Sequence, residues 1–254
     1  MGREIKYYAI YGLFLFAMLE ALLYAAIHWW PAFAENMGAM KALAAPLPIL
    51  KDQINLVDKL GAPAYVAGQH YFKACNILGS TAAILFASNA IAGEVHRGTF
   101  EVWLARPVSR LRLFTERFLL GYAAIGVAVL LSSLTTPALL QTVGTTMAYS
   151  DLVRCSLFQT LFLGAMYSVT YVFSAVSSQP LKIAFVMLFF AITEFAIYMV
   201  KTITHFSIFR WSDIETYATI IGRNELDLQR VGVLLLIQAL AFGIGLQRFL
   251  RRSP

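Results

Sequence analysis

Long apolar stretches constrain this chain more than any other feature of its sequence. They lie at about 7–30, 65–92, 118–142, 152–177, 183–199 and 231–246. Each is close to the length of about 20 residues that a helix needs to cross a bilayer. The chain is 59% hydrophobic and only 13% charged, and its mean hydropathy is +0.67. The sequence therefore predicts an all-α integral membrane protein, with six transmembrane helices in a single domain over residues 1–254.

The charges indicate how these helices are oriented. The net charge of +6 does not predict nucleic-acid binding, because the cations cluster at the ends of apolar segments, as topology signals do. The segments 93–117 and 178–182 carry Arg and Lys hard against the spans, whereas several other cations lie in two longer loops. Since the positive-inside rule acts on short loops, we expect both termini in the cytoplasm.

Cysteine and histidine give no sign of a cross-link or a metal site. Cys75 and Cys155 each lie inside an apolar stretch at different expected depths, so we expect buried thiols rather than a disulfide. None of the four histidines has a second one three or four residues away. The spacing that commonly accompanies a zinc site is therefore missing, and we expect no metal.

Two outer loops contain local structure. Residues 40–50 are apolar but interrupted by Pro46 and Pro48, which makes them too short to cross, and we expect them at the membrane interface. Between the fifth and sixth spans, Ser212 and Glu215 have the spacing of a capping box. A short outer helix should follow and end at Gly222. This helix could rest on the lipid headgroups as a surface helix, or it could act as a gate for transport.

The densest cluster of charge lies at 93–110, between the second and third spans. Thr99 suits an N-cap, and Glu101 would favour the positive end of a helix. Arg106 precedes Pro107, which disfavours further helix, so a short helix is predicted over 100–105. Its Phe100, Trp103 and Leu104 share one face. Ser109 should cap the next helix, which runs into the third span.

This short helix with an aromatic face has two interpretations. It suits insertion into a groove of another protein, because a few apolar side chains at helical spacing can anchor such a contact. It also suits an amphipathic segment lying on the inner leaflet, with its arginines near anionic headgroups. Spacing alone does not decide between them.

The motifs of this segment resemble those of a known family. Ala-Ile-Ala-Gly-Glu at 90–94, Arg-Gly-Thr-Phe-Glu at 97–101 and Leu-Ala-Arg-Pro-Val-Ser-Arg at 104–110 are similar to the inner-loop signature of type-2 ABC transporter permeases. In that signature a Glu, a Gly-Thr step ending in Glu and a Pro-x-Ser-Arg step follow the second span. About half of the chain resembles the family in detail.

The resemblance implies a membrane subunit that works as a pair, of identical or related chains, each docked on an ATP-binding subunit that holds ATP and Mg. It favours export and a bacterial or archaeal cell membrane. Residues 99–105 would form the coupling helix, with Glu94 at its hinge. The residues that the resemblance assigns to docking are Glu94, Gly98, Thr99, Phe100, Glu101, Trp103, Leu104, Arg106, Pro107 and Arg110.

Three polar residues within the spans are candidates for a translocation path: Glu20, Asn76 and Glu194. A charge at the bilayer centre costs about 2.5–3.5 kcal/mol on insertion scales, so the two glutamates need a reason. Either could face a wet cavity, or could be a neutral carboxyl bonded to a neighbouring helix. Asn76 also suits close helix packing.

No catalytic motif accompanies these features. The chain has no Gly-Lys dipeptide, so it cannot form a phosphate-binding loop and would not hydrolyse ATP by itself. An intramembrane enzyme would need a nucleophile with a base, or metal ligands, and no such motif is present. An ATPase-independent ion-coupled transporter or channel is the alternative function, although its expected inverted repeats are not visible. The cargo is not indicated.

Overall fold

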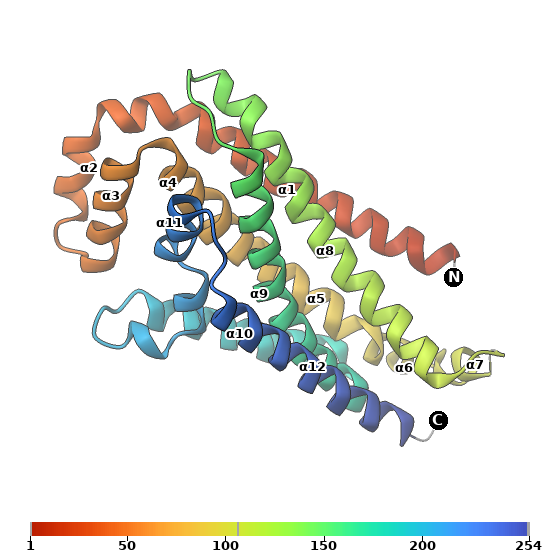
Figure 1. Ribbon diagram of the computed structural model, residues 1–254. Coiled ribbons are helices and arrows are strands. Elements are labelled where there is room, and N and C mark those ends of the chain that lie inside the picture. The colour runs from red at the N-terminus through yellow and green to blue at the C-terminus, as the bar shows by residue number, and fades with distance from the viewer. Residues whose placement is uncertain (1, 106, 253–254) are drawn as a thin grey trace.

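A computed structural model describes residues 2–105 and 107–252, with side chains from Glu4 onward. Within these residues the protein is helical throughout and has no strand (Figure 1), which confirms the all-α prediction. In the same part of the chain, five helices are long and apolar enough to cross a membrane. They are α1 (Gly2–Glu35), α8 (Arg110–Gln141), α9 (Tyr149–Val176), α10 (Pro180–Tyr198) and α12 (Leu228–Leu250).

The stretch predicted as the second span is helical but is built in three pieces. These are α4 (Ala62–Val66), the π-helix η1 (Ala67–Gly79) and α5 (Ser80–Ala90). A π-helix bonds each carbonyl to the amide five residues on, which widens the turn and interrupts the α-helical pattern. None of the pieces reaches the length of a span by itself. The six-helix prediction is therefore supported at five positions, and a crossing by 62–90 stays a prediction.

Helix α9 forms the centre of the bundle and packs against α12, α5 and α8. It is the most buried of the five long helices, because 67% of its apolar stretch lies inside the protein against 22–39% for the others. Tyr167 and Tyr171 on α9 are fully buried. The hydroxyl of Tyr167 lies where a Cβ at Gly121 would be, so a glycine on α8 is what lets the two helices approach so closely.

The two ends of the bundle differ in construction (Figure 1). One end gathers the start of α1, the end of α12 and the short helices α6 (Ala92–His96) and α7 (Phe100–Leu104). The other end carries α2 (Met37–Ala44), α3 (Pro48–Leu60) and α11 (Ile214–Arg223), together with the short 3-10 helices η2 (Thr204–Phe206) and η3 (Ile208–Ser212). The start of α1, the end of α12 and the described residues of the charged segment 93–110 thus lie at the same end.

The short helix predicted before the last span is present, but its cap differs from the prediction. Asp213 is the N-cap of α11, and its Oδ1 accepts a hydrogen bond from the amide of Thr216 at 2.9 Å. Ser212 does not cap the helix, because its hydroxyl donates inward to Asn76 Oδ1 at 2.9 Å. The helix ends at Arg223, one residue past the predicted stop, where Asn224 adopts a left-handed backbone with φ 56°.

Candidate functional site

The site begins at a break in the helical line between α5 and α6. Ile91 has φ −114° and ψ −51°, so the regular helix stops at Ala90 and restarts at Ala92. Ser174 of α9 fills the gap: its Oγ accepts hydrogen bonds from the amides of Ile91 at 3.1 Å and Ala92 at 3.0 Å, and donates to the carbonyl of Ser88 at 2.9 Å. One buried hydroxyl thus replaces the missing helical bonds and fixes the joint to α9.

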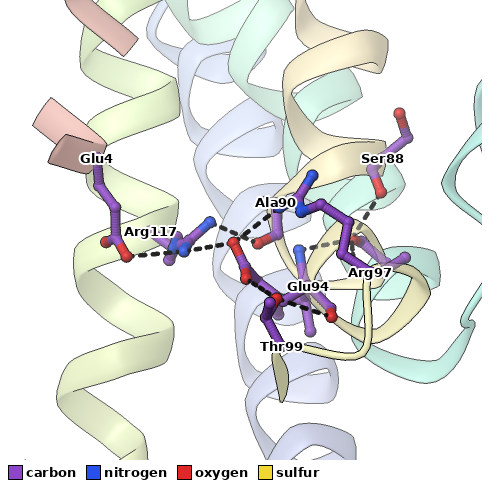
Figure 2. A network of polar contacts seen from close by, with 10 residues as sticks. Glu4, Ser88, Ala90, Glu94, Arg97, Thr99 and Arg117 are labelled. Atoms are coloured by element: carbon purple, nitrogen blue, oxygen red, sulfur yellow. Dashed lines mark hydrogen bonds and ion pairs between the residues drawn. The ribbon is translucent and has the colours of Figure 1, made fainter. Parts of the chain in front are cut away.

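Glu94 on α6 is the centre of the polar contacts at this joint (Figure 2). Its Oε1 accepts hydrogen bonds from Arg97 Nη2 at 2.8 Å and Arg117 Nη2 at 2.9 Å, and its Oε2 accepts one from Thr99 Oγ1 at 2.5 Å. The carboxylate therefore connects the start of the charged loop, the turn before α7 and the long helix α8.

Arg117 is the buried cation of this network, with only 9% of its side chain exposed. Its Nη2 also donates to Glu4 Oε1 on α1 at 2.8 Å, and its Nη1 donates to the carbonyl of Ala90 at 3.1 Å. The Ala90 carbonyl is available because α5 ends there. A single guanidinium therefore joins α1, α5, α6 and α8, and two carboxylates offset its charge (Figure 2).

The pKa of Glu94 reflects these neighbours. Partial burial by itself would raise the pKa of this carboxyl, but the hydrogen bond from Thr99 and the positive charges of Arg117 and Arg97 outweigh burial. The pKa is lowered from the ordinary value of 4.5. Glu94 is therefore ionised at neutral pH, and its charge is part of the joint.

A tight turn leads from this joint into α7. Gly98 has φ +69°. This is a left-handed backbone conformation, which residues other than glycine adopt only with strain. Thr99 occupies the predicted N-cap position, but its side chain makes no cap hydrogen bond. Its Oγ1 instead donates to the carboxylate and carbonyl of Glu94, so its observed role is to hold the turn against α6.

The aromatic face of α7 points into the protein, whereas the resemblance assigns Phe100 and Trp103 to docking on a partner, an assignment that stays a prediction. Phe100 is 5% exposed and Trp103 2% exposed. Both rings pack on Phe249 near the end of α12, at centroid distances of 6.2 and 5.7 Å, and Arg117 lies 5.0 Å from the Trp103 ring. Burial of these rings supplies the apolar contact that attaches α7 to α12.

The opposite face of α7 is open. Glu101 and Ala105 are exposed, and Val102 is 72% exposed. Among the other residues that the resemblance assigns to docking, Gly98 and Pro107 are exposed and Leu104 is half-buried, while Arg106 lies outside the described residues. The exposed Val102, with Glu101 and Ala105 also exposed, forms a surface that a second protein can cover.

The next helix is attached to the C-terminal end of the chain. Ser109 Oγ accepts a hydrogen bond from the amide of Arg112 at 3.2 Å, which confirms the predicted cap of α8. Arg110 Nη1 donates to the carbonyls of Leu250 at 3.2 Å and Arg252 at 2.7 Å. Arg252 in turn lies 5.3 Å from the Phe100 ring, so α7, α8 and α12 meet at one place.

Comparison with known families agrees with this geometry. Residues 13–253 match the family model described as ABC-2 family transporter protein. The chain belongs to this family. No curated protein and no solved structure gives a significant match. The ABC-2 family forms the membrane component of ABC transport systems, so the chain is a multi-pass permease of such a system.

In this ABC-2 permease, sequence reasoning missed two residues of the joint. Arg117 was noticed only as one of the inner cations, although an arginine eight residues inside α8, where the apolar stretch begins, signals a buried partner. Phe249 gives no local signal, because it is 146 positions from Trp103 in the sequence and only the fold brings them together. Both contact the Trp103 ring of α7.

The three candidates for a translocation path lie in three different packing contacts. Glu20 Oε2 accepts a hydrogen bond from Thr135 of α8 at 2.9 Å. Glu194 Oε2 accepts one from the amide of Ile208 at 2.9 Å. Asn76 is fully buried and donates to the carbonyl of Ser212 at 2.8 Å. Each joins two neighbouring segments, and the structure does not bring them together.

Two further predictions concern the cysteines, which were expected as buried thiols, and metal binding, which was not expected. Cys75 and Cys155 are free thiols and both are buried. In the described part of the chain, no group of three or more His, Cys, Asp or Glu side chains is placed to hold a metal ion.

Proposed function

We propose that this chain is the permease subunit of an ABC exporter, in which a separate ATPase subunit docks on α7 and drives the spans. Two permease chains and two ATPase subunits would form the working assembly, with ATP and Mg bound by the ATPase subunits. The chain termini and α7 would lie on the cytoplasmic side of the cell membrane. Family membership supports a role with an ATP-binding partner, and the attachment of α7 supports the place of contact.

The observation that carries the proposal is the two-sided construction of α7. Val102 is 72% exposed on one face, while Trp103, the next residue, is 2% exposed on the other. A subunit that pushes on the exposed face therefore pushes the buried face against Phe249 of α12. Through Glu94 and Arg117 the same displacement reaches α8 and α1.

The force would thus reach several spans together. Ser174 attaches the joint to α9, Arg117 attaches it to α1 and α8, and Arg110 attaches it to the end of α12. Interfaces packed in this way tend to switch between discrete arrangements rather than deform continuously. We infer that movement of α7 shifts the bundle between two states, with ATP supplying the difference in free energy.

Co-purification with a matched pair of variants tests this function. The tagged chain, extracted in mild detergent, should retain a stoichiometric subunit that is photolabelled by azido-ATP. Val102→Asp should abolish retention, because it places a charge in the centre of the contact. Leu47→Asp makes the same kind of change at a residue that is 51% exposed at the opposite end and should leave retention unchanged.

The alternative is transport without an ATPase. Proteoliposomes that contain only this chain would then move substrate under an ion gradient, and both aspartate variants would be equally active. Such a result would overturn the proposed coupling and leave the family assignment in place.

A further inference from the structure

A cavity of about 380 Å³ lies between α1 and the π-helix η1, and Tyr65 of α4 forms part of its lining. Alanines on both walls leave the space open: Ala25 and Ala26 on α1, and Ala74 on η1. The cavity runs from Leu22 to Trp29 along α1, a distance of about 10 Å at ~1.5 Å per residue. It is separate from the joint around Glu94 and independent of the proposed function.

The lining changes in character from one end of the cavity to the other. The end away from α4 is aliphatic, formed by Leu22, Ile77 and Leu78. The end nearer to α4 has Trp29, Tyr65 and Gln69, and such amphipathic rings prefer the level of lipid headgroups. The cavity is therefore amphipathic along the axis of α1.

Lys73 supplies the one charge among the residues that line this cavity. It is half-buried, and its ammonium points toward the headgroup end, where Nζ donates to Gln69 Oε1 at 3.2 Å. In the part of the chain that the structure describes, Lys73 makes no ion pair. A partly buried ammonium with only a neutral amide as partner is poorly compensated, so an anion at this point would be stabilised.

We propose that this cavity binds an anionic phospholipid, with its phosphate on Lys73 and the start of an acyl chain between α1 and η1. The positive charge and the absence of any acid in the lining select an anionic headgroup. The aliphatic end selects a lipid over a free phosphate ion, which would have nothing to contact there. Trp29 is 64% exposed, so the cavity opens onto the surface where bilayer lipid lies.

Trp29 provides a direct probe, because bromine atoms on a lipid chain quench nearby tryptophan fluorescence. The full chain is placed in nanodiscs that contain a small fraction of brominated phosphatidylglycerol or brominated phosphatidylcholine. The contribution of Trp29 is the difference between the wild type and Trp29→Phe. In the wild type, the anionic lipid should quench Trp29 at about fivefold lower mole fraction, as one lysine–lipid contact of about 1 kcal/mol implies.

Variants then assign this preference to the cavity. Lys73→Gln should remove it and Lys73→Arg should keep it. Lys59→Gln, which removes the same charge from an exposed position on α3, should leave it unchanged. Ala25→Phe should reduce quenching by both lipids, because it fills the cavity from an exposed position while Lys73 stays. Excess inorganic phosphate should not restore Trp29 emission.

Three results would overturn the proposal. The first is equal quenching by the two brominated lipids in the wild type. The second is an undiminished preference in folded Lys73→Gln, or undiminished quenching by both lipids in folded Ala25→Phe. The third is no quenching of Trp29 by either lipid, which would mean that a second protein chain covers this face. Thermal unfolding of each variant checks that it is folded, and Ala25→Phe keeps the test available if Lys73→Gln is not.

Discussion

At the scale of single residues, the central feature is a charge balance in a nearly closed site. Arg117 lies between Glu94 and Glu4, and the side chain of Glu94 is only 14% exposed. Among the described residues, loss of the Glu94 charge leaves Glu4 as the one carboxylate that contacts the buried Arg117 side chain, which should cost more than the loss of a surface pair. The stability of the joint between α5 and α7 should therefore depend on Glu94.

We expect Glu94→Gln to lower the free energy of unfolding by about 3 kcal/mol, which corresponds to a midpoint roughly 5–10 °C lower. Thermal unfolding in detergent, followed with a thiol-reactive dye, measures it, because Cys75 and Cys155 are free and buried and react only when the protein opens. Glu116→Gln is the matched control, since Glu116 pairs with Arg112, which is 57% exposed. It should cost less than about 1 kcal/mol. Equal losses in both variants would contradict the argument.

The same carboxylate predicts an acid-sensitive component of stability. The folded protein lowers the pKa of Glu94 from 4.5, so the unfolded chain binds this proton more tightly. The contribution of Glu94 is therefore complete above pH 4.5 and is lost as the pH falls through the lower, folded-state pKa. Thermal unfolding is followed by tryptophan fluorescence at a series of pH values. The difference in unfolding midpoint between wild type and Glu94→Gln should narrow as the pH falls below 4.5. A constant difference would count against it.

The sequence predicted the members of this site better than their connections. Glu94, Thr99 and Phe100 were found because they lie close together in one charged segment. Their contacts could not be predicted, because a hydroxyl such as that of Thr99 can cap a helix or bind a carboxylate with similar local spacing. The choice depends on Arg117, which holds Glu94 in position from another helix.

At the scale of elements, α7 is defined by what covers each of its faces. Helical periodicity correctly put Phe100 and Trp103 on one face, but periodicity does not say whether a partner or the chain itself buries that face. The deciding contact is with Phe249 of α12, near the other end of the sequence. This is why the helix was predicted within one residue while the direction of its aromatic face was not.

The inward packing makes opposite predictions for the two faces. Trp103→Ala should lower the free energy of unfolding by about 3–5 kcal/mol, since it leaves a large cavity against Phe249. Val102→Ala should change it by less than about 0.5 kcal/mol, because the side chain touches little within the chain. The dye assay measures both. If Trp103→Ala unfolded like the wild type and lost only the ATPase subunit, the ring would belong to the partner contact instead.

The N-cap of α11 is a second case in which a local sequence motif could not predict a side-chain contact. Ser212 and Glu215 had the right spacing for a capping box, yet Asp213 caps α11. Ser212 is drawn into a buried set of hydrogen bonds with Asn76 and Gln159, which come from η1 and α9. A local motif therefore predicted the helix and its start within a residue, and tertiary contacts decided which side chain performs the capping.

At the scale of the whole molecule, the open question is the path of residues 62–90 through the bilayer. The piecewise helix α4–η1–α5 begins beside α3 and ends beside α6, and these lie at opposite ends of the bundle (Figure 1). Five long apolar helices alone would place the two chain termini on opposite sides of a membrane. Contacts of Arg117 with Glu4, and of Arg110 with the carbonyl of Arg252, place the termini at the same end. A sixth crossing by 62–90 reconciles the two.

Among the described residues, 62–90 are the only candidate crossing between Leu47 and Val102. Whether these two residues lie on opposite sides of the membrane therefore decides whether 62–90 crosses it. In intact cells a membrane-impermeant maleimide should label Leu47→Cys, which is exposed beside α3, and should not label Val102→Cys until the cells are permeabilised. The native cysteines are buried and should add little background. Labelling of both from the same side would mean that 62–90 does not cross. Labelling of Val102→Cys alone in intact cells would reverse the orientation and place α7 beyond the reach of a cytoplasmic ATPase.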